Sequence, residues 1–295
     1  MKDGFVSVIG LGNMGRGMAE TLLRNGYKVM GYDLSEDARS QAEKIGVIVA
    51  PLAQLLKESK VVVLSLPKAE HVEALVLGAN GISELGHDGL IIVDTTTSTA
   101  EVSRKIHTEL KVKGMTFIDA PVSGGPSGAK SGTMTMVVGA TEEAFEKIQP
   151  FLADLSAVQV NVGECGAGNV VKICNNLLAA AHLITTAEAV ALANKAGVSP
   201  EKLLSGLNKG SGRSAVSEVN FSRWVLNGAF DSGFTMGLMR KDVGLADALA
   251  NAENMNLPLS EKVMELWKKS AETLADQEDF NAIVKMTDAD LFEGK

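Results

Sequence analysis

FVSVIGLGNMGRGMAETLLRNGYKVMGYD, residues 5–33, is the stretch that decides the fold. An apolar run, Phe5–Ile9, leads directly into a glycine-rich turn, and a helical pattern follows that turn. A second β-rich run, Lys28–Tyr32, ends at Asp33. A strand, a G-x-G-x-x-G turn, a helix and a second strand that ends in an acid form the unit that binds dinucleotides. The stretch therefore predicts a dinucleotide-binding α/β fold.

Each glycine of the turn has a separate physical role. Gly10 permits the tight turn, Gly12 lets the backbone approach a pyrophosphate, and Gly15 allows the helix to pack closely on the strand. The pyrophosphate then faces the N-terminus of the helix. Without Asp33, a glycine-rich connection that holds no ligand would explain the turn as well. The residues predicted to contact the dinucleotide here are Gly10, Leu11, Gly12, Asn13, Met14, Gly15 and Asp33.

The neighbours of Asp33 bear on which dinucleotide binds. A carboxylate at this position accepts hydrogen bonds from the adenosine ribose hydroxyls and repels a 2′-phosphate. The next residue is Leu34, where an arginine would favour NADP. We therefore predict NAD as the cofactor. Arg39, in the following helical segment, keeps NADP open as the less favoured alternative.

Short β-rich runs alternate with helical segments through the first half of the chain. Val61–Leu64 and Leu90–Val93 are continuously apolar, as expected for strands that are covered on both faces. Asn25-Gly26 closes the first helix, and Ser98-Thr99-Ala100-Glu101 is a capping box that opens a later one. This alternation predicts a parallel, doubly wound sheet. The predicted strands are Phe5–Ile9, Lys28–Tyr32, Val47–Val49, Lys60–Leu66, Gly89–Asp94, Thr116–Ala120, Thr133–Val138 and Val158–Val162.

After the last of these strands the pattern becomes helical. A long helical pattern, Gly168–Ala196, stops at Gly197, and Ser199-Pro200 supplies the cap and the first-turn proline of the next helix. We therefore predict a Rossmann-type dinucleotide-binding domain over residues 1–163. An all-helical domain for substrate binding and dimerisation is predicted over residues 164–295, with the long helix joining the two.

Composition and charge argue against several classes of protein. Of the 295 residues, 45% are hydrophobic and 22% are charged, as in soluble globular proteins. The formal net charge of −8 argues against nucleic acid or an anionic membrane as a partner, because both require a basic face. Two cysteines are too few for a disulfide framework, and the four histidines are scattered, so we predict no metal site.

The same considerations bear on location. The first predicted strand begins almost at the first residue, which predicts that no secretory leader is present. The most apolar stretch, Val170–Ala193, is interrupted by charged residues such as Lys172 and Glu188, so we expect no membrane span. We predict a cytoplasmic protein.

Two further segments carry residues that are suited to chemistry. Ser123 is followed by Gly124-Gly125, which together offer a hydroxyl and consecutive backbone N–H groups to a carboxylate. Lys172 and Asn176 are four residues apart in the long helical pattern and share one helix face. Desolvation lowers the pKa of a lysine among apolar neighbours, and the neutral amine can then take a hydroxyl proton. A glycine-rich connection and a solvated lysine are the simpler alternatives, and spacing alone leaves both open.

Four ordered motifs resemble the 3-hydroxyacid dehydrogenase family, which includes 3-hydroxyisobutyrate dehydrogenases and tartronate semialdehyde reductases. The motifs are the glycine turn, the Asp119–Gly125 segment, the Gly-x-x-x-Lys-x-x-Asn-Asn pattern of residues 168–176, and LMRKDVGLA at residues 238–246. The resemblance covers essentially the whole chain. It implies an oxidoreductase that transfers a hydride between NAD and a small 3-hydroxy acid, or the matching semialdehyde.

The resemblance also implies roles for the matching residues. It makes Lys172 the catalytic acid/base and Asn176 its helper, while Ser123, Gly124 and Gly125 grip the substrate carboxylate. The further residues implied to contact the cofactor are Leu66, Pro67, Thr97 and Lys241. Ala100 stands where the family usually has a proline, a departure that we expect to affect only the start of a helix. Because the family is usually dimeric or tetrameric, a homodimer or homotetramer is implied.

Several alternatives stay open. The substrate can be 3-hydroxyisobutyrate, glycerate or tartronate semialdehyde, a threonate-like sugar acid, or a branched dicarboxylate of the hydroxymethylglutarate type. Arg213, in Gly210–Ser214, either pairs with a second substrate anion or has a structural role. Related imine reductases typically replace the lysine, so Lys172 counts against that activity. A non-catalytic cofactor-binding module is the alternative outside catalysis.

Overall fold

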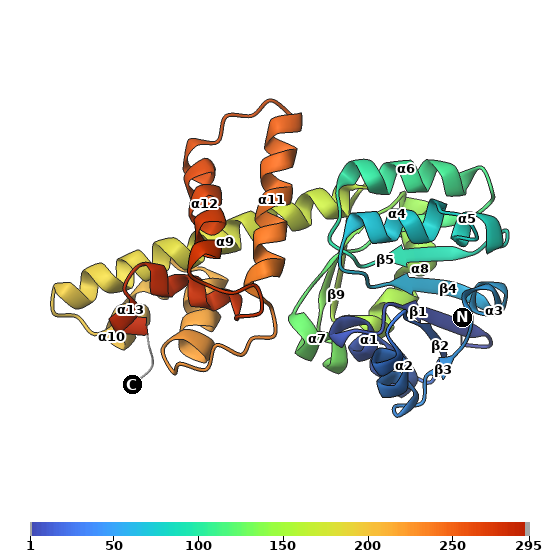
Figure 1. The fold of residues 1–295 in the computed structure, drawn as a ribbon, viewed down its shortest axis with the longest axis horizontal. Coiled ribbons are helices and arrows are strands. Elements are labelled where there is room, and N and C mark those ends of the chain that lie inside the picture. Colours follow the sequence, from blue (N-terminus) through green and yellow to red (C-terminus); the bar gives the residue numbers. More distant parts are fainter. Residues whose placement is uncertain (1, 293–295) are drawn as a thin grey trace. The chain divides into compact units, whose positions relative to one another are not determined.

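The chain folds into two compact units, Met1–Lys172 and Ile173–Lys295, in a computed structural model that describes residues 2–292 (Figure 1). The first unit contains the sheet and the second is helical, so the predicted order of an α/β domain followed by a helical domain is confirmed. Helix α9 (Ala167–Lys195) runs through the division between the units and confirms the predicted long helix. The predicted boundary between residues 163 and 164 stays a prediction.

The sheet has the strand order β3-β2-β1-β4-β5-β6-β8-β7, and β9 pairs with β8. From β3 to β6 in this order, each strand is parallel to the next. The chain winds outward from β1 in one direction through β2 and β3, and then in the other through β4 to β6. The switch point of such a sheet, between β1 and β4, is where ligands bind. The strands are β1 (Phe5–Ile9), β2 (Lys28–Tyr32), β3 (Ile48–Val49), β4 (Ser59–Leu64), β5 (Ile91–Asp94), β6 (Thr116–Asp119), β7 (Val122–Ser123), β8 (Thr135–Gly139) and β9 (Val158–Gly163).

The last strands of the sheet differ from the prediction. β8 pairs antiparallel with both β6 and β7, so the sheet is mixed and not wholly parallel. Strand β7 was not predicted, because Pro121 interrupts the run after Asp119 and the two-residue strand that follows is too short to give a pattern. Only a short helix separates β7 from β8, and parallel strands need a crossover of a dozen or more residues.

The helices of the first unit cover both faces of the sheet. They are α1 (Asn13–Arg24), α2 (Glu36–Glu43), α3 (Leu52–Glu58), α4 (Ala69–Leu77), α5 (Ile82–Leu85), α6 (Ala100–Lys111), α7 (Gly125–Ser131) and α8 (Glu142–Leu155). In β4, Val61 and Val63 join a core built with α1 and α8, whereas Val62 and Leu64 join a second core built with α3 to α6. The continuous apolar runs therefore lie where the sequence predicted, in strands covered on both sides.

The end of α1 agrees with the prediction, whereas the start of α6 differs from it by one residue. Helix α1 ends at Arg24 and Gly26 has φ +84°, which confirms the predicted stop. Helix α6 is capped by Thr99, whose hydroxyl accepts from the amide of Val102, and not by Ser98 as the predicted capping box requires. The backbone N–H of Ser98 instead donates to the side chain of Asn169 at 2.8 Å. A contact with a residue 71 positions away thus displaced the cap by one residue.

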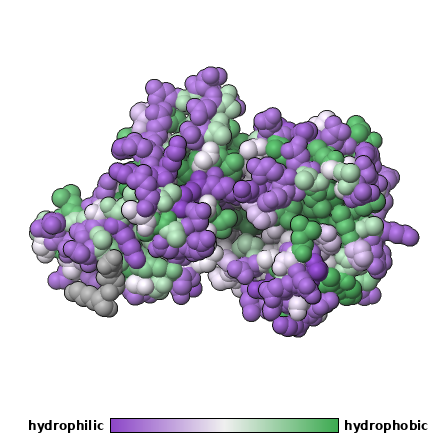
Figure 2. All heavy atoms as spheres, in the orientation of Figure 1, coloured by the Kyte–Doolittle hydropathy of each residue, from purple (hydrophilic) through white to green (hydrophobic). Residues whose placement is uncertain are grey.

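The second unit packs its helices around a separate core. Trp267 lies at its centre, fully buried, and donates from its indole N–H to the carbonyl of Ala180. The visible face of α11 and α12 is mostly hydrophilic in Figure 2, as expected for helices whose apolar sides face this core. The elements that follow α9 are α10 (Pro200–Leu207), the π-helix η1 (Val216–Val225), α11 (Met236–Ala252), α12 (Pro258–Lys269), the 3₁₀ turns η2 (Ser270–Glu272) and η3 (Phe280–Met286), and α13 (Ala289–Phe292).

Helix α9 is long and apolar enough, by length and composition, to cross a membrane, and 39% of its most apolar window is buried. One face of the helix supplies Ile173, Ala180, Leu183, Ala187 and Val190 to the core of the second unit. These core contacts account for the buried part of the helix.

The two cysteines differ in surroundings, which allows a direct test of the fold. Cys165 is buried, and burial raises the pKa of its thiol, whereas Cys174 on α9 is exposed. Because the thiolate is the reactive form, a disulfide reagent at about pH 8 should modify Cys174 and spare Cys165 in the native protein. In Cys174→Ser, no thiol should react until the protein is unfolded; rapid labelling of the native variant would contradict the buried position of Cys165.

Candidate functional site

The glycine turn joins β1 to α1 and leaves room for a ligand on one side only. Gly10 has φ +89°, and a Cβ there would lie 2.1 Å from the carbonyl oxygen of Ser65. A Cβ at Gly15 would lie 1.8 Å from the carbonyl oxygen of Gly10. By contrast, a Cβ at Gly12 would meet no atom within 4 Å. The first and third glycines are therefore required by the protein's own packing, while the second faces open space.

Asp33 is fixed by the backbone around it. Its Oδ2 accepts from the amide of Leu11 at 2.6 Å, which ties the glycine turn to the end of β2, and its Oδ1 accepts from the amide of Ser35 at 2.8 Å. Arg39 donates to the backbone carbonyls of Asp33 and Leu34 at 2.7 and 3.0 Å. Leu34 is 86% exposed. This geometry holds a carboxylate at the end of β2, where a ribose is expected.

Hydrogen bonds join the carboxyl ends of β4 and β5. The hydroxyl of Thr95 donates to the carbonyl of Leu64 at 2.6 Å, and the amide of Leu66 donates to the hydroxyl of Thr96 at 3.0 Å. Pro67 and Thr97 follow directly along the chain. The predicted cofactor contacts of the first unit thus all follow the carboxyl ends of strands that are parallel to one another, and such ends meet at one edge of a sheet.

Lys172 and Ser123 are brought together although 49 residues separate them. Lys172 Nζ donates to Ser123 Oγ at 3.1 Å, and the lysine is 9% exposed. Ser123 ends β7, and the backbone after it turns through two left-handed glycines, with φ +125° at Gly124 and +62° at Gly125. A side chain is rarely tolerated in that conformation, so both glycines are needed to present the hydroxyl and the neighbouring amides.

A buried carboxylate that the sequence did not single out anchors the helix that carries Lys172. Asp119, at the end of β6, is fully buried and accepts from the backbone amides of Gly166 at 2.6 Å and Asn169 at 2.7 Å. Burial raises the pKa of its carboxyl group, and the two N–H donors oppose that shift in part. Asp119 belongs to the segment that resembles the family, but only the folded chain shows it at the start of α9.

In the second unit a buried carboxylate joins two predicted site residues. Asp242, 2% exposed on α11, accepts from the side-chain amide of Asn176 at 2.5 Å. Its other oxygen lies 3.1 Å from Lys241 Nζ. Asn176 and Lys241 are 65 residues apart in sequence, and Asp242 links them. The sequence signal was an acid next to Lys241 in a helix with a buried apolar face, where an aspartate needs a partner.

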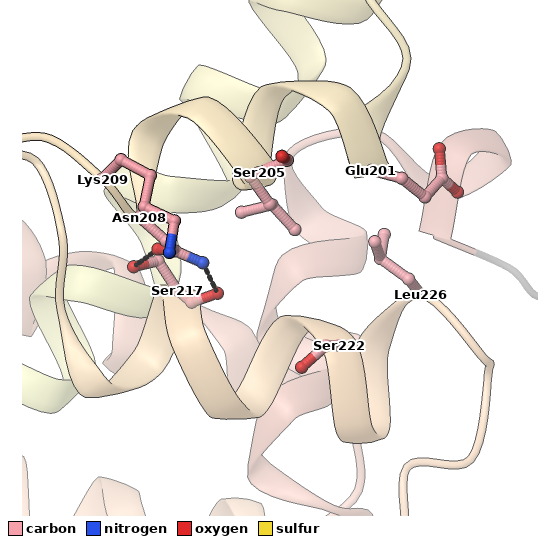
Figure 3. Close-up of a pocket in the computed structure, with 8 residues that line it drawn as sticks. Glu201, Ser205, Asn208, Lys209, Ser217, Ser222 and Leu226 are labelled. Atoms are coloured by element: carbon pink, nitrogen blue, oxygen red, sulfur yellow. Dashed lines mark hydrogen bonds between the residues drawn. The ribbon is translucent and has the colours of Figure 1, made fainter.

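The remaining candidates lie apart from these contacts. Arg213 is 63% exposed and its guanidinium lies 3.7 Å from Glu218, so it has an acidic neighbour within the chain. A cavity of about 370 Å³ is lined in part by Glu201, Lys209 and Ser222, from α10, the residues after it and η1. Figure 3 shows these lining side chains. In the cavity lining, the Ser217 hydroxyl donates to Asn208 Oδ1 at 2.7 Å, and Asn208 Nδ2 donates to the carbonyl of Ser217 at 3.1 Å. Within residues 2–292, no cluster of three or more His, Cys, Asp or Glu side chains is arranged to hold a metal ion.

Comparison with known proteins identifies the family. Residues 5–166 match the model described as the NAD-binding domain of 6-phosphogluconate dehydrogenase. Residues 166–287 match the model described as NAD-binding of NADP-dependent 3-hydroxyisobutyrate dehydrogenase. The chain belongs to the 3-hydroxyacid dehydrogenase family. The predicted family and fold class and the predicted oxidoreductase class with NAD as cofactor are confirmed.

Three members of this family illustrate how far the similarity extends. The chain is 35% identical to 2-(hydroxymethyl)glutarate dehydrogenase of Eubacterium barkeri over 95% of its own length and 94% of the relative. It is 35% identical to 3-hydroxyisobutyrate dehydrogenase of Pseudomonas aeruginosa, over 95% and 97%. A solved structure of Mycobacterium tuberculosis 3-hydroxyisobutyrate dehydrogenase with L-serine superposes with a TM-score of 0.87 at 29% identity, over 97% and 99% of the two chains.

The contrast between Gly12 and Gly15 gives a test of the cofactor site that needs no substrate. Gly12→Ala should fold normally, because its Cβ meets open space, but should weaken NADH binding by filling the space for the pyrophosphate. Gly15→Ala should lower the melting temperature, because its Cβ would overlap the carbonyl of Gly10. NADH fluorescence titration and thermal unfolding measure both. Unchanged NADH affinity in a folded Gly12→Ala would remove the glycine turn from the site.

The contact set of Asp242 predicts a local loss of stability. Asp242→Asn keeps the shape of the side chain but removes the charge that faces Lys241, at a position that is 2% exposed. The free energy of unfolding should fall by about 1–3 kcal/mol. Asp247→Asn, at an exposed position on the same helix, should change it by less than about 0.5 kcal/mol. Equal urea midpoints for the two variants would show that the Asp242 contacts contribute no stability.

Proposed function

We propose that this chain oxidises the hydroxyl group of a small 3-hydroxy acid, or reduces the corresponding semialdehyde, with NAD, and that Lys172 is the general acid/base. The observation that carries the proposal is the 3.1 Å contact between Lys172 Nζ and Ser123 Oγ. It places an amine and a hydroxyl donor side by side, beside two glycine amides. One hydroxy acid can contact both groups, with its carboxylate at Ser123 and its hydroxyl at Lys172.

Lys172 moves the proton in this proposal. In the oxidation, the neutral Nζ takes the proton of the substrate hydroxyl while the C–H bond of the same carbon breaks and a hydride leaves. In the reduction, the ammonium form returns that proton to the carbonyl oxygen. The nicotinamide, when bound, accepts or supplies the hydride. The low exposure of Lys172 keeps bulk water away from the proton that is transferred.

Ser123, Gly124 and Gly125 hold the substrate carboxylate in the proposal. The Ser123 hydroxyl and consecutive backbone amides are neutral donors, and left-handed glycines make such amides converge. Asn176 lies one helical turn after Lys172 on α9 and positions the reacting groups through its side-chain amide. Its bond to Asp242 fixes which way that amide points.

The residues proposed to hold the cofactor fit a dinucleotide. Asp33 accepts from the adenosine ribose, and we propose a preference for NAD because the carboxylate would face a 2′-phosphate. The remaining contacts in the proposal are Gly10, Leu11, Gly12, Asn13, Met14 and Gly15 at the pyrophosphate, and Leu66, Pro67, Thr97 and Lys241 toward the nicotinamide. The open space at Gly12 is the structural feature that supports this assignment.

The compounds associated with the relatives narrow the substrate class that we propose. 3-Hydroxyisobutyrate, 2-(hydroxymethyl)glutarate and L-serine share one unit, a primary alcohol on the carbon next to the one that bears the carboxylate. They differ only in the third substituent: a methyl group, a propionate chain or an ammonium group. We therefore propose a substrate of the form HOCH₂–CHR–COO⁻. We further propose a cytoplasmic homodimer or homotetramer that binds neither nucleic acid nor membranes, in line with the net charge of −8.

The function is tested by following absorbance at about 340 nm with NAD, and separately with NADP, across acids that differ only in R. The wild-type chain should reduce NAD with at least one acid of this form. Lys172→Ala should lower kcat by about 10²-fold or more, because a positioned general base contributes roughly that factor. NADH binding, measured by fluorescence, should be retained.

A control variant on the same helix distinguishes the loss of the Lys172 amine from a general effect of losing a lysine. Lys195→Ala removes an exposed lysine from the last turn of the same helix and should leave kcat unchanged. Wild-type rates in Lys172→Ala would exclude Lys172 as the acid/base. No turnover of any acid in the panel, with NADH still bound, would favour a non-catalytic cofactor-binding module.

A further inference from the structure

Asp119 joins the sheet to α9 in an unusual way. A helix leaves the N–H groups of its first turn without partners inside the helix, and a cap is normally supplied by a residue just before it. Here the cap comes from a strand about 50 residues earlier in the chain: one carboxylate oxygen accepts from Gly166 at 2.6 Å and the other from Asn169 at 2.7 Å. Both oxygens of Asp119 therefore accept hydrogen bonds from the backbone at the start of α9.

Two glycines bring the backbone against this carboxylate. Gly139, the partner of Asp119 in the β6–β8 ladder, has room for no side chain, because a Cβ would lie 2.2 Å from Asp119 Oδ1. A Cβ at Gly168 would lie 2.6 Å from the carbonyl oxygen of Val137 and 3.0 Å from that of Asp119. The first turn of α9 thus lies against the sheet, with no space for a side chain at Gly168.

The same junction connects the segments that carry the proposed chemistry. Ser123 lies four residues after Asp119, and Lys172 lies three residues after Asn169, which is less than one helical turn. The side chain of Asn169 accepts from the amide of Ser98 and donates to the hydroxyl of Ser103 at 3.1 Å, so the β5–α6 connection is held as well.

We infer that Asp119 is a positioning residue, whose buried carboxylate fixes the first turn of α9 so that Lys172 Nζ stays within hydrogen-bond distance of Ser123 Oγ. The inference rests on the proposed function for its kinetic consequence, but the contact itself is a matter of structure. We assign Asp119 no direct part in the reaction, because it is fully buried and both of its oxygens accept from backbone amides.

The chemistry at this position requires a carboxylate and not only a side chain of its shape. Asparagine has one acceptor oxygen, and its NH₂ group would face one of the two backbone N–H donors. Two donors that face each other in a buried site repel, and neither finds another partner. Asp119→Asn must therefore release either Gly166 or Asn169, and the first turn of α9 moves away from the sheet.

The experiment compares Asp119→Asn with wild type in crystal structures and in steady-state kinetics on an acid that the wild type accepts. The Lys172 Nζ–Ser123 Oγ separation should exceed about 3.5 Å in the variant, the limit of a hydrogen bond. kcat should fall roughly 10- to 100-fold, since a displacement of about 1 Å costs that much. The affinity for NADH should stay within about twofold, and the primary deuterium isotope effect on kcat should rise as the chemical step becomes slower.

Ser103→Ala is the matched control. It removes a buried hydroxyl from the same network, but one that bonds to the Asn169 side chain and not to the first-turn amides. Its kcat and isotope effect should equal those of wild type even if its melting temperature falls. Should Asp119→Asn fail to fold, Gly168→Ala replaces it, because the added Cβ pushes the same turn off the sheet while the carboxylate is kept.

The outcomes separate this inference from the proposed function. An unchanged Lys172–Ser123 contact in the folded variant overturns the inference, as does a loss of kcat in Ser103→Ala that equals that in Asp119→Asn. A wild-type chain that turns over no acid refutes the proposed function alone, and the crystallographic comparison then still decides whether Asp119 positions Lys172.

Discussion

The bonds to the carboxylate of Asp119 from the backbone amides of Gly166, just before α9, and Asn169, in its first turn, join the sheet to the helix that carries Lys172. They start the helix at a defined point on the sheet, and the contact between Lys172 and Ser123 follows less than a turn later. From there the same helix continues into the second unit and supplies apolar side chains to its core. A single helix therefore carries Lys172 and contributes residues to both units.

The pKa of Asp119 bears on what this carboxylate contributes to stability. Burial raises the pKa of its carboxyl group, because the charged form is poorly solvated there, and the two N–H donors recover only part of that cost. A carboxyl group whose pKa is raised on folding contributes most to stability at low pH, and that contribution is lost as the pH rises through the folded-state value. At neutral pH the desolvation of this carboxylate therefore opposes folding, and the bonds from Gly166 and Asn169 offset part of that cost. The positioning of α9 is the role that we propose for it.

Sequence reasoning succeeded where the controlling interactions are local. The turn at Gly10 and the stop at Gly26 need positive φ angles, and a glycine at such a position predicts them directly. It was wrong where distant residues decide. The side chain of Asn169 accepts from the amide of Ser98, and Thr99 caps α6 instead. Strand β8 pairs antiparallel with β6 and β7, so the sheet is mixed. Asp119 and Asp242 were overlooked as contacts for the same reason, since no spacing rule connects residues that meet only in the folded chain.

In the proposed function, Ser123 and Lys172 would bind only the groups that the proposed substrates share. A carboxylate and a neighbouring primary alcohol would occupy both residues, so other residues would have to contact the third substituent. Arg213 is a weak candidate for a second carboxylate, because it is 63% exposed and already has Glu218 at 3.7 Å, and an incoming anion would compete with that acid. An exposed ion pair contributes little free energy, so it also offers little discrimination between a methyl group and a charged chain. Selectivity for R is therefore expected to come from the shape and polarity of buried residues and not from this surface arginine.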